Sequence, residues 1–200
     1  MKGWDEMKKI LLLGDSIRMG YQQDVTEQLA GEYQVLYPED NGRFAAYTLW
    51  QVNQMFKHNE GIELVHFNNG YWDMNVEAPM TEPIHPVEEY LSFLRRIVAL
   101  CRQQGAQVIF ATTVPILEAG SAGDNTGVQG TINYSNEWVK TYNAAAVALM
   151  EELQVPVNDL YALCMEDERR YKCEDLLHLS AEGSRRCAAQ VAAMVRKTLG

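Results

Sequence analysis

A serine near the start of the chain and an acid–imidazole pair near its end are the residues best suited to chemistry. Ser16 follows a Gly-Asp pair at the end of a short apolar run. Asp175 and His178 lie three residues apart, just ahead of the last stretch of helical periodicity. A serine hydroxyl becomes a nucleophile when a neutral imidazole takes its proton and a carboxylate orients that imidazole. Together the three residues predict acyl transfer through an acyl-enzyme on Ser16.

Each segment also has a simpler explanation. Gly-Asp-Ser is common turn chemistry, and Ser16 could cap the helix that follows it. Asp175 or Ser180 could cap the last helix, with His178 packed at the surface. A non-catalytic domain that holds an anion or a carbohydrate at the Ser16 turn would have no use for Asp175 and His178. A hydrolase and an acyltransferase would both use all three residues, so the sequence leaves those two activities open.

Short apolar runs alternate with segments of helical periodicity, and this alternation sets the fold class. The expected strands are residues 8–13, 33–37, 62–67, 107–112 and 156–158. The expected helices are residues 20–30, 44–56, 86–104, 137–153 and 181–199, with a surface loop at 120–134. The pattern predicts one α/β domain over residues 1–200, a three-layer α/β/α sandwich with a five-stranded parallel sheet. Ligands bind beyond the strand carboxyl ends in such sheets, which is where Ser16 lies.

The first and last segments resemble the two outer blocks of the SGNH (GDSL-type) hydrolase superfamily. The Gly-Asp-Ser-Ile run that contains Ser16 matches the first block, and Asp-x-x-His from Asp175 to His178 matches the last. The resemblance covers nearly the whole chain. It implies a flavodoxin-like fold, ester hydrolysis by Ser16, His178 and Asp175, and no metal or organic cofactor.

In this family the two middle blocks supply donors to an oxyanion hole. Gly42 matches the family's glycine after the second strand, and its backbone N–H would join that of Ser16. In the third block Trp72 stands where the family has asparagine, and an indole cannot act as a compact amide donor. A subgroup pattern, His-Phe-Asn-x-Gly-x-(Trp/His)-Asp, makes Asn68 the side-chain donor instead. Asn68 and Asn69 could also serve only as turn residues, and which of them completes the hole is open.

Three further residues are candidates for contact with substrate. Tyr71 and Trp72 are expected to wall the site, because aromatic faces suit sugar or acyl groups, with simple packing as the alternative. Arg18 could contact a polar substrate or could be a solvated surface residue. The sequence has no long apolar lid segment, which favours a small-molecule ester with a short acyl group, such as acetyl on a carbohydrate.

Composition excludes several other function classes. The formal net charge is −10 and no run of Lys or Arg occurs, so neither nucleic acid nor an anionic membrane is expected as a partner. The apolar run at residues 10–13 is too short for a signal peptide or a membrane span, which predicts a cytoplasmic protein. The four cysteines lack CxxC spacing and are expected to be reduced, and no His, Cys or acid spacing indicates a metal site. The oligomeric state is not predicted.

Overall fold

The structure is a computed structural model that describes residues 7–76, 79–117 and 135–200. Its centre is a five-stranded sheet in the order β2-β1-β3-β4-β5, with every neighbouring pair parallel. The strands are β1 (Lys8–Leu13), β2 (Tyr33–Leu36), β3 (Ile62–Asn68), β4 (Gln107–Ala111) and β5 (Val157–Asn158). The predicted five-stranded parallel sheet is confirmed.

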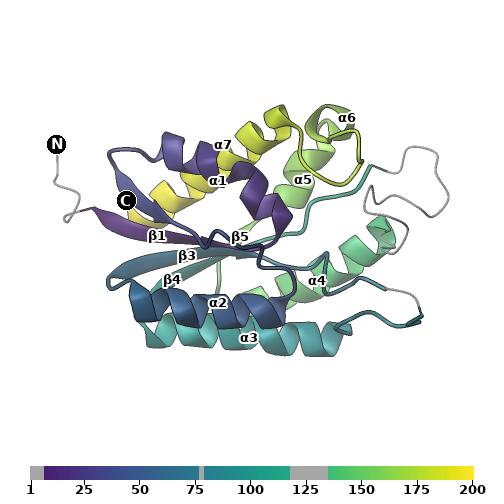
Figure 1. The fold of residues 1–200 in the computed structure, drawn as a ribbon, viewed down its shortest axis with the longest axis horizontal. Helices are drawn as coiled ribbons and strands as arrows, with labels where there is room; N and C mark the ends of the chain where they lie inside the picture. Colours follow the sequence, from purple (N-terminus) through teal and green to yellow (C-terminus); the bar gives the residue numbers. More distant parts are fainter. Residues whose placement is uncertain (1–6, 77–78, 118–134) are drawn as a thin grey trace.

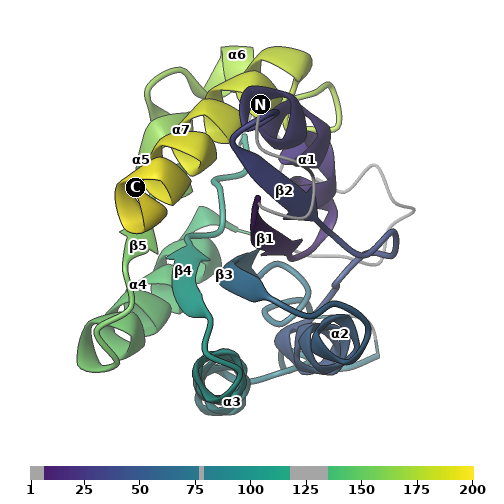
Figure 2. The ribbon, with the colours of Figure 1, turned by 90° about the vertical axis from the view of Figure 1, so that its left-hand side faces the viewer.

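Helices cover both faces of the sheet and make three layers (Figures 1 and 2). One face carries α1 (Ser16–Gln28) and α7 (Ala181–Leu199), with the short α5 (Leu160–Met165) and α6 (Glu168–Tyr171) beside them. The other face carries α2 (Ala45–His58), α3 (Val87–Gln103) and α4 (Asn136–Glu152). Because both faces are covered, β1 is apolar from Ile10 to Leu13 and those four side chains are fully buried.

The first helix begins earlier than the sequence predicts. The sequence predicts a helix from about residue 20, whereas α1 starts at Ser16. Asp15 is the N-cap, and its Oδ1 accepts the backbone N–H of Ile17 at 2.9 Å. An N-cap carboxylate satisfies a backbone donor that has no acceptor within the helix, so the helix can start directly after the strand. Ser16 is therefore the first residue of a helix rather than part of a loop.

The remaining differences between prediction and structure concern short elements. The helices α5 and α6 were not expected, because four to six residues are too few to show a clear period. The surface loop predicted for 120–134 lies outside the described residues. None of the helices in the described ranges is long and apolar enough to cross a bilayer.

Candidate active site

The turn between β1 and α1 holds Ser16 in a fixed position at the carboxyl edge of the sheet. Gly14 has φ +141°, and a Cβ there would lie 2.3 Å from Asn68 Oδ1 at the end of β3. Only glycine allows β3 to approach the turn this closely in that backbone conformation. Asp15 then caps α1, and Ser16 is exposed enough to be reached from solvent.

The loop between α6 and α7 presents Asp175 and His178. Asp175 Oδ1 accepts the backbone N–H groups of Leu177 and His178 at 3.0 and 2.9 Å. Asp175 Oδ2 lies 2.6 Å from His178 Nδ1. The backbone N–H of Cys173 donates to the His178 carbonyl at 2.9 Å, which closes the loop. One carboxylate therefore organises both the loop backbone and the imidazole.

The structure brings the three predicted residues together. His178 Nε2 lies 2.8 Å from Ser16 Oγ, although 162 residues separate them in the sequence. Ser16, His178 and Asp175 thus form a continuous hydrogen-bonded chain. The side chains of His178 and Asp175 are 35% and 34% exposed, so a substrate can reach the site from solvent. This is the arrangement in which an imidazole takes a hydroxyl proton and a carboxylate stabilises the imidazolium that forms.

The environment of Asp175 keeps its carboxyl group ionised. Partial burial pushes the pKa of Asp175 upward, but hydrogen bonds from the His178 ring and from the backbone N–H groups of His178 and Leu177 outweigh it. The net pKa lies below the usual value for aspartate. Asp175 is therefore negatively charged at neutral pH, as a residue that stabilises an imidazolium must be.

The two other predicted oxyanion donors have acceptors inside the protein. The Gly42 N–H donates to the Gly14 carbonyl at 2.8 Å, so it ties two loops together. Asn68 Nδ2 donates to Asp15 Oδ1 at 3.0 Å, and Asn68 Oδ1 accepts the Tyr21 hydroxyl at 3.2 Å. Asn68 is thus anchored directly beside the Ser16 turn, whereas the Gly42 N–H is used for structure.

The neighbouring asparagine faces a different element. Asn69 Nδ2 donates to the Arg43 carbonyl at 3.0 Å and to Thr48 Oγ1 at 2.9 Å. These bonds join the end of β3 to the start of α2. Asn68 therefore supports the turn that carries Ser16, and Asn69 supports the loop between β2 and α2.

The expected roles of Arg18 and Tyr71 at the substrate are wrong. Arg18 is fully buried on α1, and its guanidinium donates to the Pro38 and Asp40 carbonyls at 3.0 and 2.8 Å, with Gln22 as a further acceptor. It fastens the loop after β2 and is neither a substrate contact nor a solvated residue. The Tyr71 hydroxyl is buried and donates to the Val114 carbonyl at 2.5 Å.

Trp72, the other expected wall residue, is half-buried and packs against the hydrophobic core. In the described part of the chain no hydrogen bond joins it to Ser16 or His178.

The family is decided by comparison with known proteins. The sequence profile of the GDSL-like lipase/acylhydrolase family matches residues 12–186. The chain belongs to this family. It is therefore an enzyme of the esterase and acylhydrolase class.

Individual relatives of this GDSL-like hydrolase agree in sequence and fold. The GDSL esterase/lipase CPRD49 of Arabidopsis thaliana is 25% identical over 203 residues, which cover 94% of this chain and 79% of the relative. The crystal structure of the lipase/acylhydrolase from Enterococcus faecalis superposes with a TM-score of 0.75 at 20% identity, covering 97% of this chain and 98% of that one. The acetyl xylan esterase AlAXEase superposes with a TM-score of 0.67 at 17% identity, covering 94% and 99%.

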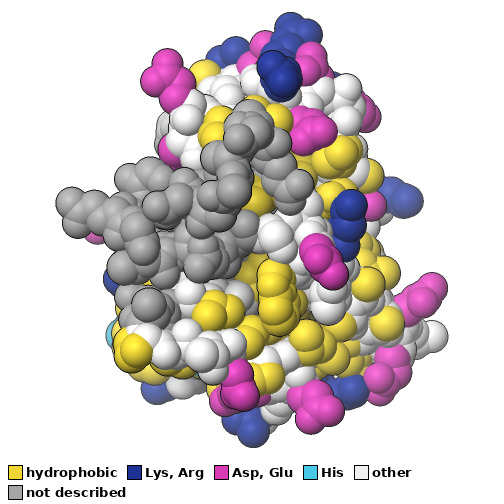
Figure 3. Space-filling model, turned by 90° about the vertical axis from the view of Figure 1, so that its right-hand side faces the viewer, with side chains coloured by type: hydrophobic (Ala, Val, Ile, Leu, Met, Phe, Trp, Pro, Cys, Tyr) yellow, Lys and Arg dark blue, Asp and Glu magenta, His cyan; other side chains and the backbone are white. Residues whose placement is uncertain are grey.

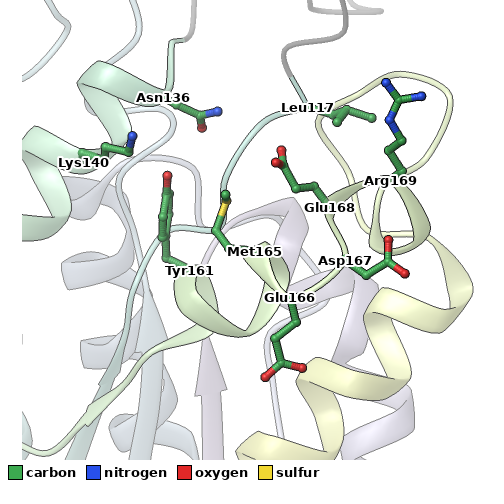
Figure 4. Close-up of a pocket in the computed structure, with 9 residues that line it drawn as sticks. All are labelled: Leu117, Asn136, Lys140, Tyr161, Met165, Glu166, Asp167, Glu168 and Arg169. Carbon is green, nitrogen blue, oxygen red and sulfur yellow. The ribbon is translucent and has the colours of Figure 1, made fainter.

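The carboxyl edge of the sheet in this GDSL-like hydrolase carries a cavity of about 510 Å³ between α4, α5 and α6. Tyr161 and Lys140 lie on one side of it, and Glu168 and Arg169 lie on the other (Figure 4). Leu117 lines the cavity, and its N–H donates to the Leu176 carbonyl, in the loop that carries His178, at 2.9 Å. On the molecular face at this edge, hydrophobic side chains gather in the lower half with charged ones around them (Figure 3).

The structure contains a second acid–imidazole pair that the sequence does not indicate. Asp73 Oδ1 lies 2.8 Å from His85 Nδ1, and both Asp73 oxygens accept the Ala45 N–H at the start of α2. Asp73 lies in the segment after β3, Ala45 begins α2 and His85 precedes α3, so the pair links these three parts of the fold. Burial raises the pKa of Asp73 against the lowering effect of His85, and the Asp73 hydrogen bond raises the pKa of His85. Twelve residues of separation give no sequence signal for this contact.

No group of three or more His, Cys, Asp or Glu side chains within the described residues could hold a metal ion.

Proposed function

We propose that this GDSL-like hydrolase is a serine esterase that cleaves short-acyl carboxylic esters through an acyl-enzyme on Ser16. The observation that carries the proposal is the hydrogen-bonded chain from Ser16 Oγ through His178 to Asp175, with contacts of 2.8 and 2.6 Å. The proposal assigns Ser16 as nucleophile, His178 as general base and acid, and Asp175 as the residue that orients His178.

The reaction proceeds in two halves. In the first, Ser16 Oγ attacks the ester carbonyl while His178 Nε2 takes the hydroxyl proton, and Asp175 stabilises the imidazolium. The C–O bond to the alcohol then breaks, His178 returns the proton to the departing alcohol, and the acyl group remains on Ser16. In the second half, His178 removes a proton from water, the hydroxide attacks the acyl-enzyme, and His178 returns that proton to Ser16 as the acid leaves.

The oxyanion is stabilised from the Ser16 turn. The Ser16 N–H lies in the first turn of α1, where backbone donors have no acceptor within the helix and the helix dipole favours negative charge. Asn68 Nδ2 carries two hydrogens, and Asp15 accepts one of them. We assign the other Nδ2 hydrogen to the oxyanion. The hydrogen bond to Asp15 holds the amide in place. Gly42 contributes by bracing Gly14 rather than by donating to substrate.

Replacing Asn68 tests this assignment. Asn68→Ala is expected to lower kcat by about 100-fold or more with KM little changed, because the oxyanion bond forms mainly in the transition state. Asn69→Ala is the matched control, and it should affect the melting temperature more than kcat because its amide bonds Arg43 and Thr48. The readouts are steady-state kinetics with p-nitrophenyl acetate and thermal melting. If Asn69→Ala loses kcat while Asn68→Ala keeps it, the donor is Asn69.

A cavity at the same edge of the sheet and one relative support a proposal for the substrate class. We infer that the alcohol part of the ester is polar, with an acetylated carbohydrate as the leading case. The cavity combines one aromatic face, Tyr161, with the hydrogen-bonding side chains of Lys140, Glu168 and Arg169. Aromatic faces and charged hydrogen-bonding groups together suit sugar rings. The structurally similar AlAXEase is an acetyl xylan esterase.

A substrate panel tests both the activity and its class. We expect acetate release to water from p-nitrophenyl acetate and from acetylated xylo-oligosaccharides, with kcat/KM falling as the acyl chain lengthens. Tyr161→Ala should raise KM for the oligosaccharide about three- to tenfold, the worth of one ring contact, and leave p-nitrophenyl acetate unaffected. Equal KM changes for both substrates would exclude the cavity as the alcohol site. Acyl transfer to an added alcohol in preference to water would identify an acyltransferase.

A further inference from the structure

A lysine lies buried beneath the loop that carries Asp175 and His178. Lys172 is only 5% exposed, and its Nζ donates to the Leu177 carbonyl at 2.6 Å. Its backbone forms an isolated antiparallel bridge with Leu179. Lys172 therefore contacts the loop on both sides of His178, once through its side chain and once through its backbone.

The groups around Lys172 do not neutralise it by direct pairing. The titratable groups that face the ammonium are Cys164 on α5, Cys187 on α7, Asp175 in the loop and Asp15 at the start of α1. Cys164 Sγ and Cys187 Sγ lie 3.8 Å apart, and both side chains are fully buried. In the described part of the chain no carboxylate lies within ion-pair distance of Lys172 Nζ.

Burying a charge without a paired counter-ion opposes folding, and an apolar side chain of similar length would avoid that cost. Stability alone therefore does not account for a lysine at this position. The carbonyl that accepts its hydrogen bond belongs to Leu177, the residue that precedes His178. The next residue back, Leu176, has φ +65°, a left-handed conformation that is unfavourable for leucine, so the loop needs contacts that hold it.

We propose that Lys172 is a positioning residue for the reaction at Ser16: its buried ammonium holds the Leu177 carbonyl and keeps the loop in the conformation in which His178 reaches Ser16. The ammonium and the Asp175 carboxylate also attract each other electrostatically. Lys172 touches neither substrate nor the reacting atoms and acts through the loop. This inference rests on the proposed esterase function.

The role should be visible in the pH dependence of the reaction. Burial lowers the pKa of Lys172 to about 8, against the raising effects of Cys164, Cys187, Asp175 and Asp15. Above that pH the Lys172 ammonium of the folded protein loses a proton. Its charge-assisted hydrogen bond to the Leu177 carbonyl then becomes a weaker, neutral one. Between about pH 8 and the pKa of an unfolded lysine, the unfolded chain binds more protons, so the Lys172 contribution to stability rises with pH. As the pH rises above about 8, kcat should therefore fall while the Lys172 contribution to the free energy of unfolding rises.

Lys172→Met tests the proposal, with Lys197→Met on the exposed face of α7 as the matched control. For Lys172→Met we expect kcat for p-nitrophenyl acetate to fall about ten- to a hundredfold, as small displacements of catalytic groups do. KM should change less than about twofold, and the melting temperature should be equal or higher because a buried charge is removed. Wild type and Lys197→Met should lose kcat above about pH 8 while circular dichroism stays native, and Lys172→Met should lack that alkaline limb.

Two results would overturn the inference. One is a Lys172→Met enzyme with kcat within about twofold of wild type. The other is a loss of kcat that follows a lower melting temperature with the alkaline limb intact, which indicates a structural role alone. If Lys172→Met does not fold, the wild-type profile decides, because a kcat that stays flat to about pH 10 in folded protein excludes the role. Failure of the esterase function itself would appear separately, as hydrolysis that Ser16→Ala does not reduce.

Discussion

Ser16→Ala is expected to lower kcat for p-nitrophenyl acetate by about 10⁴- to 10⁶-fold, to a rate supplied by binding and the remaining donors alone. Without the hydroxyl no acyl-enzyme can form, and His178 is left 2.8 Å from a position that no longer carries a nucleophile. KM should change little, because the lost interaction belongs to the transition state. The fold should be retained, since Ser16 is partly exposed and alanine is a good helix residue at the start of α1.

The same residue can be identified without kinetics. A fluorophosphonate reagent should label Ser16 in the wild-type protein, because an imidazole-activated serine attacks phosphorus electrophiles, and mass spectrometry of peptides locates the adduct. Ser92→Ala, at an exposed serine on α3, is the control that should keep both labelling and turnover. Labelling of another serine in the folded enzyme, or hydrolysis that survives in Ser16→Ala, would remove Ser16 from the mechanism.

Much of the fold could be predicted because its signals are local and strong. The apolar run of β1 is bounded by glycine and buried on both faces, so its sequence differs clearly from that of an amphipathic helix. The start of α1 could not be placed as well, since Asp15 had to be recognised as an N-cap rather than as part of a turn. The short helices α5 and α6 depend on caps and packing, because each is too short to show periodicity.

The site could be predicted where residue types and their spacing in the sequence are compatible with few reactions, as for Ser16, Asp175 and His178. It was not predictable where burial decides a residue's role. Arg18 looks like a surface arginine in sequence, and only the fold brings the Pro38 and Asp40 carbonyls to its guanidinium. Lys172 differs from the exposed lysines in its burial, which its sequence context does not indicate. Expectations for partners, location and reduced cysteines come from composition and stay predictions.

The described structure contains two acid–imidazole pairs. Replacing the aspartate of each pair by asparagine compares the same change at a partly exposed and at a buried position. Asp175 and His178 are each about a third exposed and end at Ser16. Asp73 is fully buried, and besides the His85 ring it bonds the Ala45 N–H. We therefore expect the first pair to take part in proton transfer and the second to hold the start of α2 against the segment after β3.

Asp175→Asn should lower kcat by about 10⁴-fold, because the neutral amide cannot stabilise an imidazolium and can turn its NH₂ toward His178, which selects the wrong tautomer. Its melting temperature should change little, since an asparagine oxygen can still accept the Leu177 and His178 N–H groups. Asp73→Asn should give the reverse pattern, with kcat nearly unchanged and a loss of about 1 to 3 kcal/mol in the free energy of unfolding, because a buried polar pair is left poorly matched. Both variants are measured by p-nitrophenyl acetate kinetics and urea unfolding. A large fall in kcat for Asp73→Asn with a native unfolding curve would place the His85 pair in the chemistry, and full activity in Asp175→Asn would exclude Asp175 as the residue that sets the tautomer of His178.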